Sequence, residues 1–412
     1  MPRHALPHGL LLIVLAVSLL AACQSEEQEP TPTSVSPTAT AVRAEATATP
    51  AMTPTATVTA AMGALLSPGP TFGNVEQFFF LNGSDLWQAQ SNGRVVRVTR
   101  DLDLGPWAMA PDGSRAIAVI RRVENTLPTE EIRIIRGDGL LSLPLYGPLP
   151  TSGVDARPTI VALDWSWDQT KLVVLFHDGA VGVLPVPDNE DQYPVAMERI
   201  VQAGNVNPGR KAAWSLSSNG FAYIAGERGE SRLVVVPLGD EPQEIAPDVA
   251  TRAFAWLPGR GRLAFVERAG GTGREMPGSI FTMAADGTSR ELLLSAGQFA
   301  PAALVMSLRA SPDGRFIAFT VFVPGPQGTP TFQSLWALNI DSGELVNIPV
   351  ATGYRVADIW WAAQGLSWRA VSLDAPAADD PTQYRGTGAF LIQRYDDASG
   401  TSTTIFSAGS AR

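Results

Sequence analysis

The chain has 412 residues, of which 45 % are hydrophobic and 17 % are charged, and its formal net charge is −10. The hydrophobic share is large enough for a sizeable core, whereas the negative charge and the lack of Lys/Arg-rich runs argue against nucleic acid as a partner. Because Cys23 is the single cysteine, the sequence excludes intramolecular disulfides and gives no basis for thiol catalysis.

Residues 1–22 have the features of a lipoprotein signal peptide. Arg3 precedes an apolar run of about eleven residues from Leu10, which is too short to span a bilayer comfortably. The run ends in Leu20-Ala21-Ala22-Cys23, which matches the bacterial lipobox; an ordinary Ala-x-Ala cleavage site beside an incidental cysteine is the alternative. We therefore predict that lipid on Cys23 anchors the mature protein to the outer face of the cell membrane, or to the outer membrane if the host has two.

Residues 23–65 form a segment dominated by Thr, Pro and Ala, as in PTPTSVSPTATAV. It lacks the aromatic and branched aliphatic residues that would offset the entropy of ordering, and its prolines favour extended conformations. The composition predicts a disordered tether between the membrane and the rest of the chain. Threonines beside prolines are candidate O-glycosylation sites, and a bare spacer is the alternative.

Residues 66–412 contain one pattern six times: a short apolar stretch, a tight polar turn and a second apolar stretch. The clearest copies are WAMAPDGSRAIAVI from Trp107 and LRASPDGRFIAFTV from Leu308. The turns lie about 40–56 residues apart, a spacing typical of one supersecondary unit per repeat. The residues that anchor the turns are Asp112, Asp168, Asn219, Gly259, Asp313 and Gln364.

Each copy continues into further strands. In the fifth, the turn Ser311-Pro312-Asp313-Gly314 is followed by FIAFTVF, SLWALNI and LVNIP. Proline sets the first turn dihedral, Asp accepts backbone N–H groups and Gly takes the positive-φ position. Four antiparallel strands per repeat without helical periodicity predict an all-β fold, a β-propeller of four-stranded blades. We expect Trp and Phe beside the turns to pack between neighbouring blades.

The number of blades depends on the segment FFFLNGSDLWQAQSNGRVVRVT, which precedes the first copy. Its three strand-like runs form either a separate blade, with an inner strand from LSPGPTF near Leu66, or the outer part of the sixth blade. The last copy carries its own third and fourth strands and leaves no gap to fill. Seven blades are therefore favoured over six.

Two segments, SPDGRFIAF and IFTMAADGTSRELL, resemble the repeat of the TolB-type, WD-repeat-like bacterial propellers. The resemblance covers most of residues 76–407 and implies the propeller fold. Members of that family include periplasmic binding partners and accessory domains of peptidases. No separate N-terminal domain like that of TolB itself is evident, so a role in envelope transport does not carry over.

The residues give little support to a catalytic centre. His177, the sole histidine beyond the signal peptide, precedes Asp178-Gly179 and is expected in a hairpin turn. One histidine cannot build a multi-histidine metal site, and the Gly-x-Ser-x-Gly elbow of hydrolases is missing. Few residues follow Phe406, which argues against an appended peptidase domain. We expect no catalytic residue, metal or cofactor.

Binding is expected at the face where the longer connections gather, such as Val123 to Glu131 and Val323 to Phe332. Five charged residues near the expected starts of inner strands are predicted to line the mouth of the channel there, unless they are merely solvated rim charges. These residues are Asp164, Lys211, Arg252, Arg309 and Asp358.

The features together predict a membrane-anchored, extracytoplasmic lipoprotein whose propeller binds a protein, peptide or glycan without catalysis. The first alternative is a hydrolase or lyase with carboxylates at the channel, for which Asp164 and Asp358 are candidates. The second is a purely structural component of the cell envelope.

Overall fold

The computed structural model describes most of residues 77–408, with gaps at 83–84, 91–93, 101, 125–126, 153–157, 202–207, 227–230, 240–241, 246–249, 269–277, 300–302, 325–329, 363–364, 374–388 and 397–398. These residues belong to one compact unit, Thr55–Arg412. The predicted signal peptide, the lipidation site Cys23 and the tether lie outside the described residues. In the part of the chain that is described, no helix is long and apolar enough to cross a membrane.

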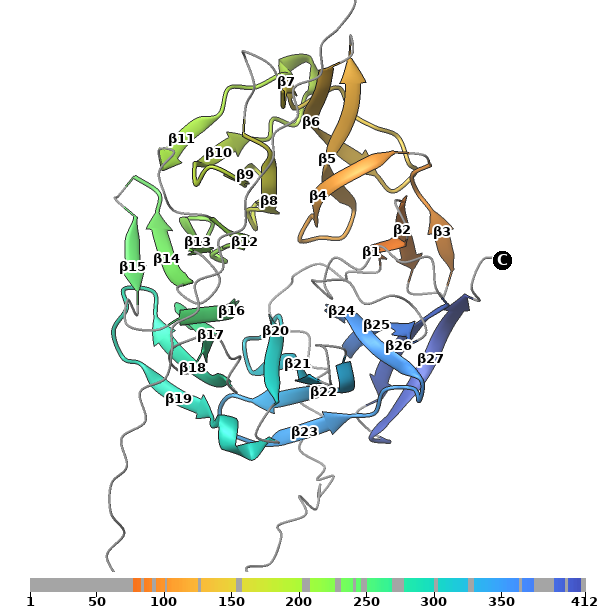
Figure 1. Ribbon diagram of the computed structural model, residues 1–412, viewed down its shortest axis with the longest axis vertical. Helices are drawn as coiled ribbons and strands as arrows, with labels where there is room; N and C mark the ends of the chain where they lie inside the picture. The colour runs from red at the N-terminus through yellow and green to blue at the C-terminus, as the bar shows by residue number, and fades with distance from the viewer. Residues whose placement is uncertain are drawn as a thin grey trace, which may run out of the picture. The chain divides into compact units, whose positions relative to one another are not determined.

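Seven antiparallel sheets follow one another in chain order around a ring (Figure 1). Blade 1 contains β1 (Gln77–Asn82), β2 (Asp85–Gln90) and β3 (Val95–Arg97). Blade 2 contains β4 (Asp103–Met109), β5 (Arg115–Glu124), β6 (Leu127–Arg136) and β7 (Tyr146–Pro150). Blade 3 contains β8 (Ile160–Trp165), β9 (Lys171–Phe176), β10 (Val181–Pro185) and β11 (Glu198–Val201). Blade 4 contains β12 (Pro208–Trp214), β13 (Gly220–Ala225), β14 (Arg232–Pro237) and β15 (Gln243–Ile245).

The remaining three blades repeat the same order. Blade 5 contains β16 (Ala250–Leu257), β17 (Arg262–Arg268), β18 (Gly278–Ala284) and β19 (Glu291–Leu294). Blade 6 contains β20 (Leu304–Ala310), β21 (Phe316–Pro324), β22 (Pro330–Asn339) and β23 (Leu345–Ile348). Blade 7 contains β24 (Tyr354–Ala362), β25 (Gly365–Ser372), β26 (Phe390–Asp396) and β27 (Thr401–Ala408). Two short 3-10 helices, η2 (Glu190–Gln192) and η3 (Ala296–Gln298), lie in connections.

The predicted all-β propeller with seven blades is confirmed. Six sheets have four strands, and the sheet of blade 1 has three among the described residues. By their pairing and order, β1, β2 and β3 correspond to the second, third and fourth strands of the other blades. The segment LSPGPTF, expected to supply the inner strand of blade 1, lies outside the described residues.

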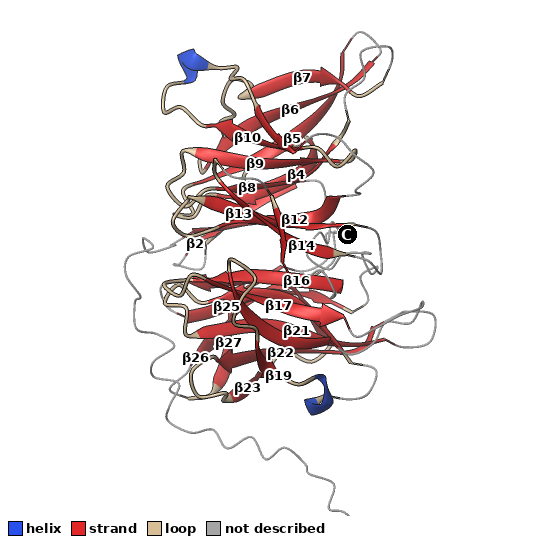
Figure 2. Ribbon diagram, turned by 90° about the vertical axis from the view of Figure 1, so that its left-hand side faces the viewer, coloured by secondary structure: helices blue, strands red, loops and turns tan. Residues whose placement is uncertain are grey.

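The second strand of each blade is apolar along most of its length because a neighbouring blade covers each of its two faces. All six residues of β13 are buried, as are five of the six residues of β9. The first strands lie nearest the centre of the ring (Figure 1), and strands such as β8 and β16 run across its thickness (Figure 2). Since consecutive strands are antiparallel, the turns after first and third strands lie on one face of the ring, and the other connections lie on the opposite face.

In the repeated polar turns, the Asp side chains accept hydrogen bonds from their own hairpins. Asp112 Oδ1 accepts hydrogen bonds from the N–H and the hydroxyl of Ser114, at 3.0 and 2.8 Å. Equivalent bonds from Thr288 lower the pKa of Asp286. The carboxylates are therefore occupied by their own turns, which accounts for the Asp-Gly pattern without a repeated ligand site.

One turn anchor was placed two residues too late. In blade 4 the residue with positive φ is Ser218 (φ 55°), which corresponds to Gly113 (φ 71°) in blade 2. The position of Asp112 is therefore held by Ser217, not by Asn219. The error arose because Asn-Gly is a common turn signal in sequence, whereas here Gly220 already begins β13.

The connection between β5 and β6 is much shorter than expected. Residues 123–131 were predicted as a long loop, but the pairing continues to Glu124 and Leu127, which leaves only residues 125–126 between the strands. The expected loop from Val323 to Phe332 shrinks to residues 325–329 for the same reason. Charged and Pro-containing sequence at a hairpin end was mistaken for loop because such a tip projects beyond the core and need not be apolar.

Candidate functional site

The inner strands align residue by residue near the end at which they enter the first hairpin turn. Two neighbouring positions in this alignment decide how blades meet. The later of the two, which we call the seam position, is occupied by Met109, Trp165, Trp214, Trp256, Ala310 and Trp361 in blades 2 to 7. The earlier one, which we call the preceding position, is occupied by Ala108, Asp164, Ala213, Ala255, Arg309 and Trp360.

In blades 3, 4, 5 and 7, tryptophan at the seam position joins the blade to the one before it. Its indole Nε1–H donates to the backbone carbonyl of the preceding position in the earlier blade. The four bonds are Trp165 to Ala108 at 3.3 Å, Trp214 to Asp164 at 3.2 Å, Trp256 to Ala213 at 2.9 Å and Trp361 to Arg309 at 3.2 Å. The expected packing of aromatic residues between blades is confirmed, and the indole N–H adds direction to it.

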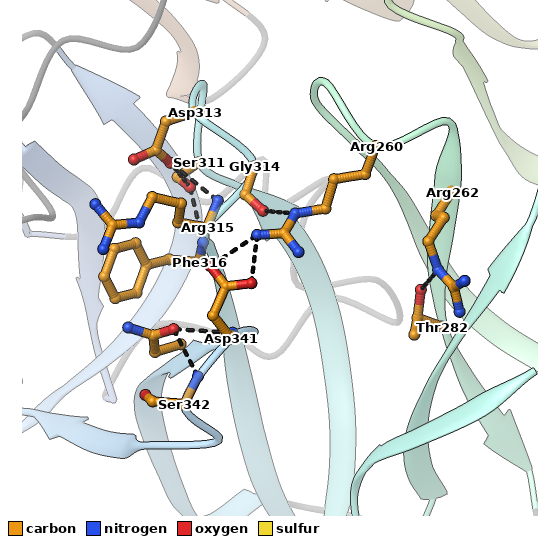
Figure 3. A network of polar contacts seen from close by, with 11 residues as sticks. Arg260, Arg262, Thr282, Ser311, Asp313, Gly314, Arg315, Phe316, Asp341 and Ser342 are labelled. Atoms are coloured by element: carbon orange, nitrogen blue, oxygen red, sulfur yellow. Dashed lines mark hydrogen bonds and ion pairs between the residues drawn. The ribbon is translucent and has the colours of Figure 1, made fainter.

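Blade 6 has Ala310 at the seam position, and an arginine takes over the connection to blade 5. Arg260, in the first turn of blade 5, donates from Nε to the carbonyl of Gly314 at 2.9 Å (Figure 3). Its Nη2 donates to both carboxylate oxygens of Asp341, at 2.8 and 2.9 Å. Both acceptors belong to turns of blade 6, so this side chain joins the two blades at their rim.

A second arginine closes the ring between blades 7 and 1. Arg369 on β25 is 1 % exposed, and its Nε donates to Asp358 Oδ2 at 2.7 Å. Its Nη1 donates to the carbonyl of Leu81 on β1, and its guanidinium carbon lies 5.2 Å from the centroid of the Phe80 ring. Phe78 stacks on Trp360 across the same boundary. Blade 7 therefore holds blade 1 by a buried cation and by aromatic contacts.

Asp164 is the most perturbed acid of the described inner strands. Its Oδ2 accepts the backbone N–H of Trp214 at 3.1 Å. The residue keeps some exposure to solvent, but protein surrounds its carboxyl group on nearly all sides, and this burial raises its pKa to about 6. Hydrogen bonds from backbone N–H groups and the positive charges of Arg309 and Lys211 lower the pKa in part, without cancelling the effect of burial.

The two cations that act on Asp164 come from different blades. Lys211 on β12 donates from Nζ to the carbonyl of Phe254 at 2.5 Å and lies 5.0 Å from the centroid of the Phe254 ring. Arg309 on β20 is exposed, and its one hydrogen bond among the described residues is weak, from Nη1 to the carbonyl of Leu308 at 3.4 Å. We call Asp164, Lys211 and Arg309 the central charge cluster, since all three lie on inner strands and interact electrostatically.

The other two predicted site residues fall elsewhere. Asp358 is paired with the buried Arg369, a structural contact that accounts for its charge without a ligand. Arg252 lies in the β-bulge of β16, and its side chain is outside the described residues. The structure therefore brings together three of the five predicted residues.

The expected position of the cluster needs a correction. Asp164 and Arg309 are the last residues but one of β8 and β20, and Lys211 lies in the middle of β12, whereas all were expected near strand starts. The cluster is thus closer to the short-turn face than to the long-connection face. The misplacement arises because each described inner strand contains a β-bulge, which adds residues before the regular pairing begins.

Three contributors were missed by sequence reasoning: the seam tryptophans as hydrogen-bond donors, Arg260 and Arg369. For the tryptophans a signal existed, because Trp165, Trp214 and Trp256 stand at the same point of consecutive repeats. Arg260 and Arg369 gave no such signal, since their partners are distant in sequence and the surrounding repeats carry other residues there.

Metal and histidine chemistry find no support in the described residues. No group of three or more His, Cys, Asp or Glu side chains in this part of the chain is arranged to hold a metal ion. His177 lies in the hairpin turn after β9, as predicted, and its N–H donates to the carbonyl of Thr159. Asp178 accepts the N–H of Ala180, the usual role of Asp in such a turn.

Comparisons with known proteins identify the fold and no family. No protein-family model matches the chain, and no curated protein matches it. A prolyl endopeptidase structure aligns with 81 % of this chain at 12 % identity and a TM-score of 0.53. An oligogalacturonate lyase from Vibrio parahaemolyticus aligns with 80 % of this chain and 84 % of its own at 10 % identity, with a TM-score of 0.51.

A putative TolB from Agrobacterium tumefaciens is also similar, at 17 % identity over 61 % of this chain and 82 % of its own, with a TM-score of 0.41. The match to the prolyl endopeptidase spans 48 % of that longer chain. The likeness to the prolyl endopeptidase and to the oligogalacturonate lyase shows a shared propeller fold alone, because propellers with unrelated activities have the same architecture.

Proposed function

We propose that this protein is a membrane-anchored, extracytoplasmic lipoprotein whose propeller is a non-catalytic binding module for a protein, peptide or glycan. The central charge cluster is the observation that carries the binding role. The preceding position holds Ala108, Ala213 and Ala255 in three other blades, so blade packing does not require a charge there. Asp164 and Arg309 occupy this position in blades 3 and 6, where a ligand at the centre of the ring would meet them.

The support for the anchor comes from the sequence alone. The lipobox Leu20-Ala21-Ala22-Cys23 and the Pro-rich segment after it favour a propeller tethered at a membrane surface. Changing Cys23 to Ser should move the protein from the membrane fraction to the soluble fraction. Continued retention of Cys23→Ser in membranes would contradict the lipid anchor.

The binding role is tested by capture from native membranes with full-length protein. Arg309→Ala should lose the partners that the wild-type protein captures, because it removes the exposed cation of the cluster. Arg232→Ala is a matched control, since Arg232 is exposed and pairs with Glu244 on the outer strands of blade 4. If wild type and Arg309→Ala captured the same set, the centre of the ring would not be the binding site.

A hydrolase or lyase is the second candidate, and one observation favours it. With a pKa of about 6, Asp164 is suited to donate and accept protons near neutral pH. The similar lyase acts, by its name, on oligogalacturonate. Ultraviolet absorbance of unsaturated products from oligogalacturonate, lost in Asp164→Asn, would favour this candidate over simple binding.

A further inference from the structure

The charges of the central charge cluster do not balance. Asp164 contributes one negative charge, whereas Lys211 and Arg309 contribute two positive charges. The cluster thus carries about one net positive charge in a chain whose formal net charge is −10. A local excess of the opposite sign attracts anions and raises their local concentration.

The hydrogen-bond donors of the cluster are unequally occupied. The Nζ of Lys211 already donates to the carbonyl of Phe254. Arg309 has five N–H donors, and its described contacts are a single 3.4 Å bond to Leu308 and the long-range attraction to Asp164. No ion pair within the described residues includes Arg309, whereas Arg260 and Arg369 are each paired with a carboxylate. Its guanidinium is therefore the group best placed to receive a ligand.

The geometry and charge of the cluster select a class of ligand. A guanidinium presents parallel N–H groups that match the two oxygens of a carboxylate. A single negative charge on the ligand neutralises the net positive charge, whereas a dianion such as phosphate would remain under-compensated and would be repelled by ionised Asp164.

We propose that the centre of the ring binds a carboxylate group of the ligand through Arg309, with Lys211 adding positive charge and Asp164 opposing it. This inference rests on the proposed binding function and names the chemistry that the site recognises. The carboxylate can come from a peptide C-terminus or from an acidic sugar, and the experiment below separates these sources.

The role of Asp164 gives the proposal a pH dependence with a definite sign. Burial raises the pKa of Asp164 to about 6, so the residue is largely ionised at pH 7 and largely protonated at pH 5. Protonation removes the negative charge and leaves the two cations, which strengthens the attraction for an anion. The groups that act on its carboxyl are the backbone N–H groups of Trp214 and Trp165 and the cations of Lys211 and Arg309. Carboxylate binding should therefore tighten as the pH falls from 7 to 5.

The test measures binding by isothermal titration calorimetry to the full-length protein in detergent. One pair of probes is N-acetyl-trialanine and its C-terminal amide, and the other is galacturonate and its methyl ester. We expect the free acid of one pair to bind and its neutral analogue to bind at least about tenfold more weakly. Equal binding of acid and neutral forms, or no binding by either acid, would overturn the proposal.

Three variants assign the effect to the cluster. Arg309→Gln should weaken binding of the free acid by about tenfold or more, and Arg232→Gln should leave it unchanged. Asp164→Asn should bind more tightly than wild type at pH 7 and should lose the pH dependence between pH 5 and 7. An unchanged affinity in Arg309→Gln, or a wild-type pH profile in Asp164→Asn, would refute the roles assigned here.

The same variants separate this inference from the wider proposal. If native-membrane partners were captured equally by wild type and Arg309→Gln, and no acid probe bound, the protein would remain a binding module with another site. If wild-type protein captured nothing, the binding function itself would fail. Melting temperatures near that of wild type would show that Arg309→Gln is folded.

Discussion

Different side chains join neighbouring blades at the boundary between blades 3 and 4 and at the boundary between blades 5 and 6. At the first, Trp214 is 1 % exposed and donates to the backbone carbonyl of Asp164. At the second, Ala310 cannot donate from its side chain, and Arg260 bonds from the rim to Gly314 and Asp341. The indole hydrogen bond at the first boundary is neutral and buried, whereas the arginine contacts at the second are ionic and partly exposed.

The comparison explains how charges could enter the inner strands without weakening the ring. Each tryptophan bonds to a backbone carbonyl, which is present whatever the side chain of that residue is. The preceding position is therefore able to hold Ala108 or Ala213 in one blade and Asp164 or Arg309 in another while the same bond forms. Bonding through the backbone leaves these side chains available for another purpose.

The largest loss of stability is expected at the buried ion pair between Arg369 and Asp358. Arg369→Met removes the bonds to Leu81 and leaves Asp358 without its cation, so the free energy of unfolding should fall by about 3–5 kcal/mol. Chemical denaturation measures this change, and the double variant with Asp358→Asn should recover part of it. A loss below about 1 kcal/mol would mean that this contact does not close the ring.

A smaller loss of stability is expected at the buried, uncharged hydrogen bond of the Trp214 indole. Trp214→Phe keeps an aromatic ring but removes the N–H donor to Asp164, which should cost about 1–3 kcal/mol. Trp361→Phe is the matched variant, because its bond to Arg309 is more exposed and water can replace it. Equal losses of stability in the two variants would indicate that the volume of the indole side chain, and not its hydrogen bond, holds neighbouring blades together.

The smallest loss of stability is expected at the partly exposed ion pair between Arg260 and Asp341. Arg260→Gln should lower the free energy of unfolding by at most about 1 kcal/mol at low salt, because Arg260 and Asp341 are 30 % and 54 % exposed. The difference from wild type should shrink in about 1 M salt, where screening reduces the attraction. Arg232→Gln, which breaks a pair inside one blade, is the control. A salt-independent loss would show that the bond to the Gly314 carbonyl dominates.

Asp164 provides a separate test through the pH dependence of stability. Because its folded-state pKa of about 6 lies above the ordinary value of 3.8, the folded protein binds more protons than the unfolded chain between these values. Stability from this group is present below about pH 4 and is lost as the pH rises through about 6. Asp164→Asn should therefore be more stable than wild type at pH 7, by at most about 3 kcal/mol, and similar to it near pH 4. Equal stability at pH 7 would contradict the burial of this charge.

The fold could be predicted because its signals are local. A hairpin such as Ser311 to Gly314 specifies its own geometry, and its repetition indicated six blades, to which the strand-like runs before the first copy added a seventh. Bulges were not predictable, since the extra residue in each inner strand has no constant type, and this displaced Asp164 and Arg309 from the expected end of their strands.

The site could be predicted only in part, because its contacts are long-range. Charged residues within apolar repeats were visible in the sequence, which identified Asp164, Lys211 and Arg309 as candidates. The same reasoning included Asp358, whose partner Arg369 lies on the next strand of its blade and reaches into blade 1. The sequence does not show which charged residue is paired within the protein and which can contact a ligand, because this depends on which side chains face each other across the ring.

The bond between Arg369 and Leu81 joins residues 288 positions apart, and this separation has a consequence for biosynthesis. Blade 1 is made first, yet its partner surface on blade 7 exists only when nearly the whole chain has been made. Closing so long a loop also carries a larger entropic cost than any contact between consecutive blades. We therefore expect the ring to close last during folding, after the intermediate blades have stacked in order, and a chain shortened before β25 to expose the apolar side of blade 1 to degradation.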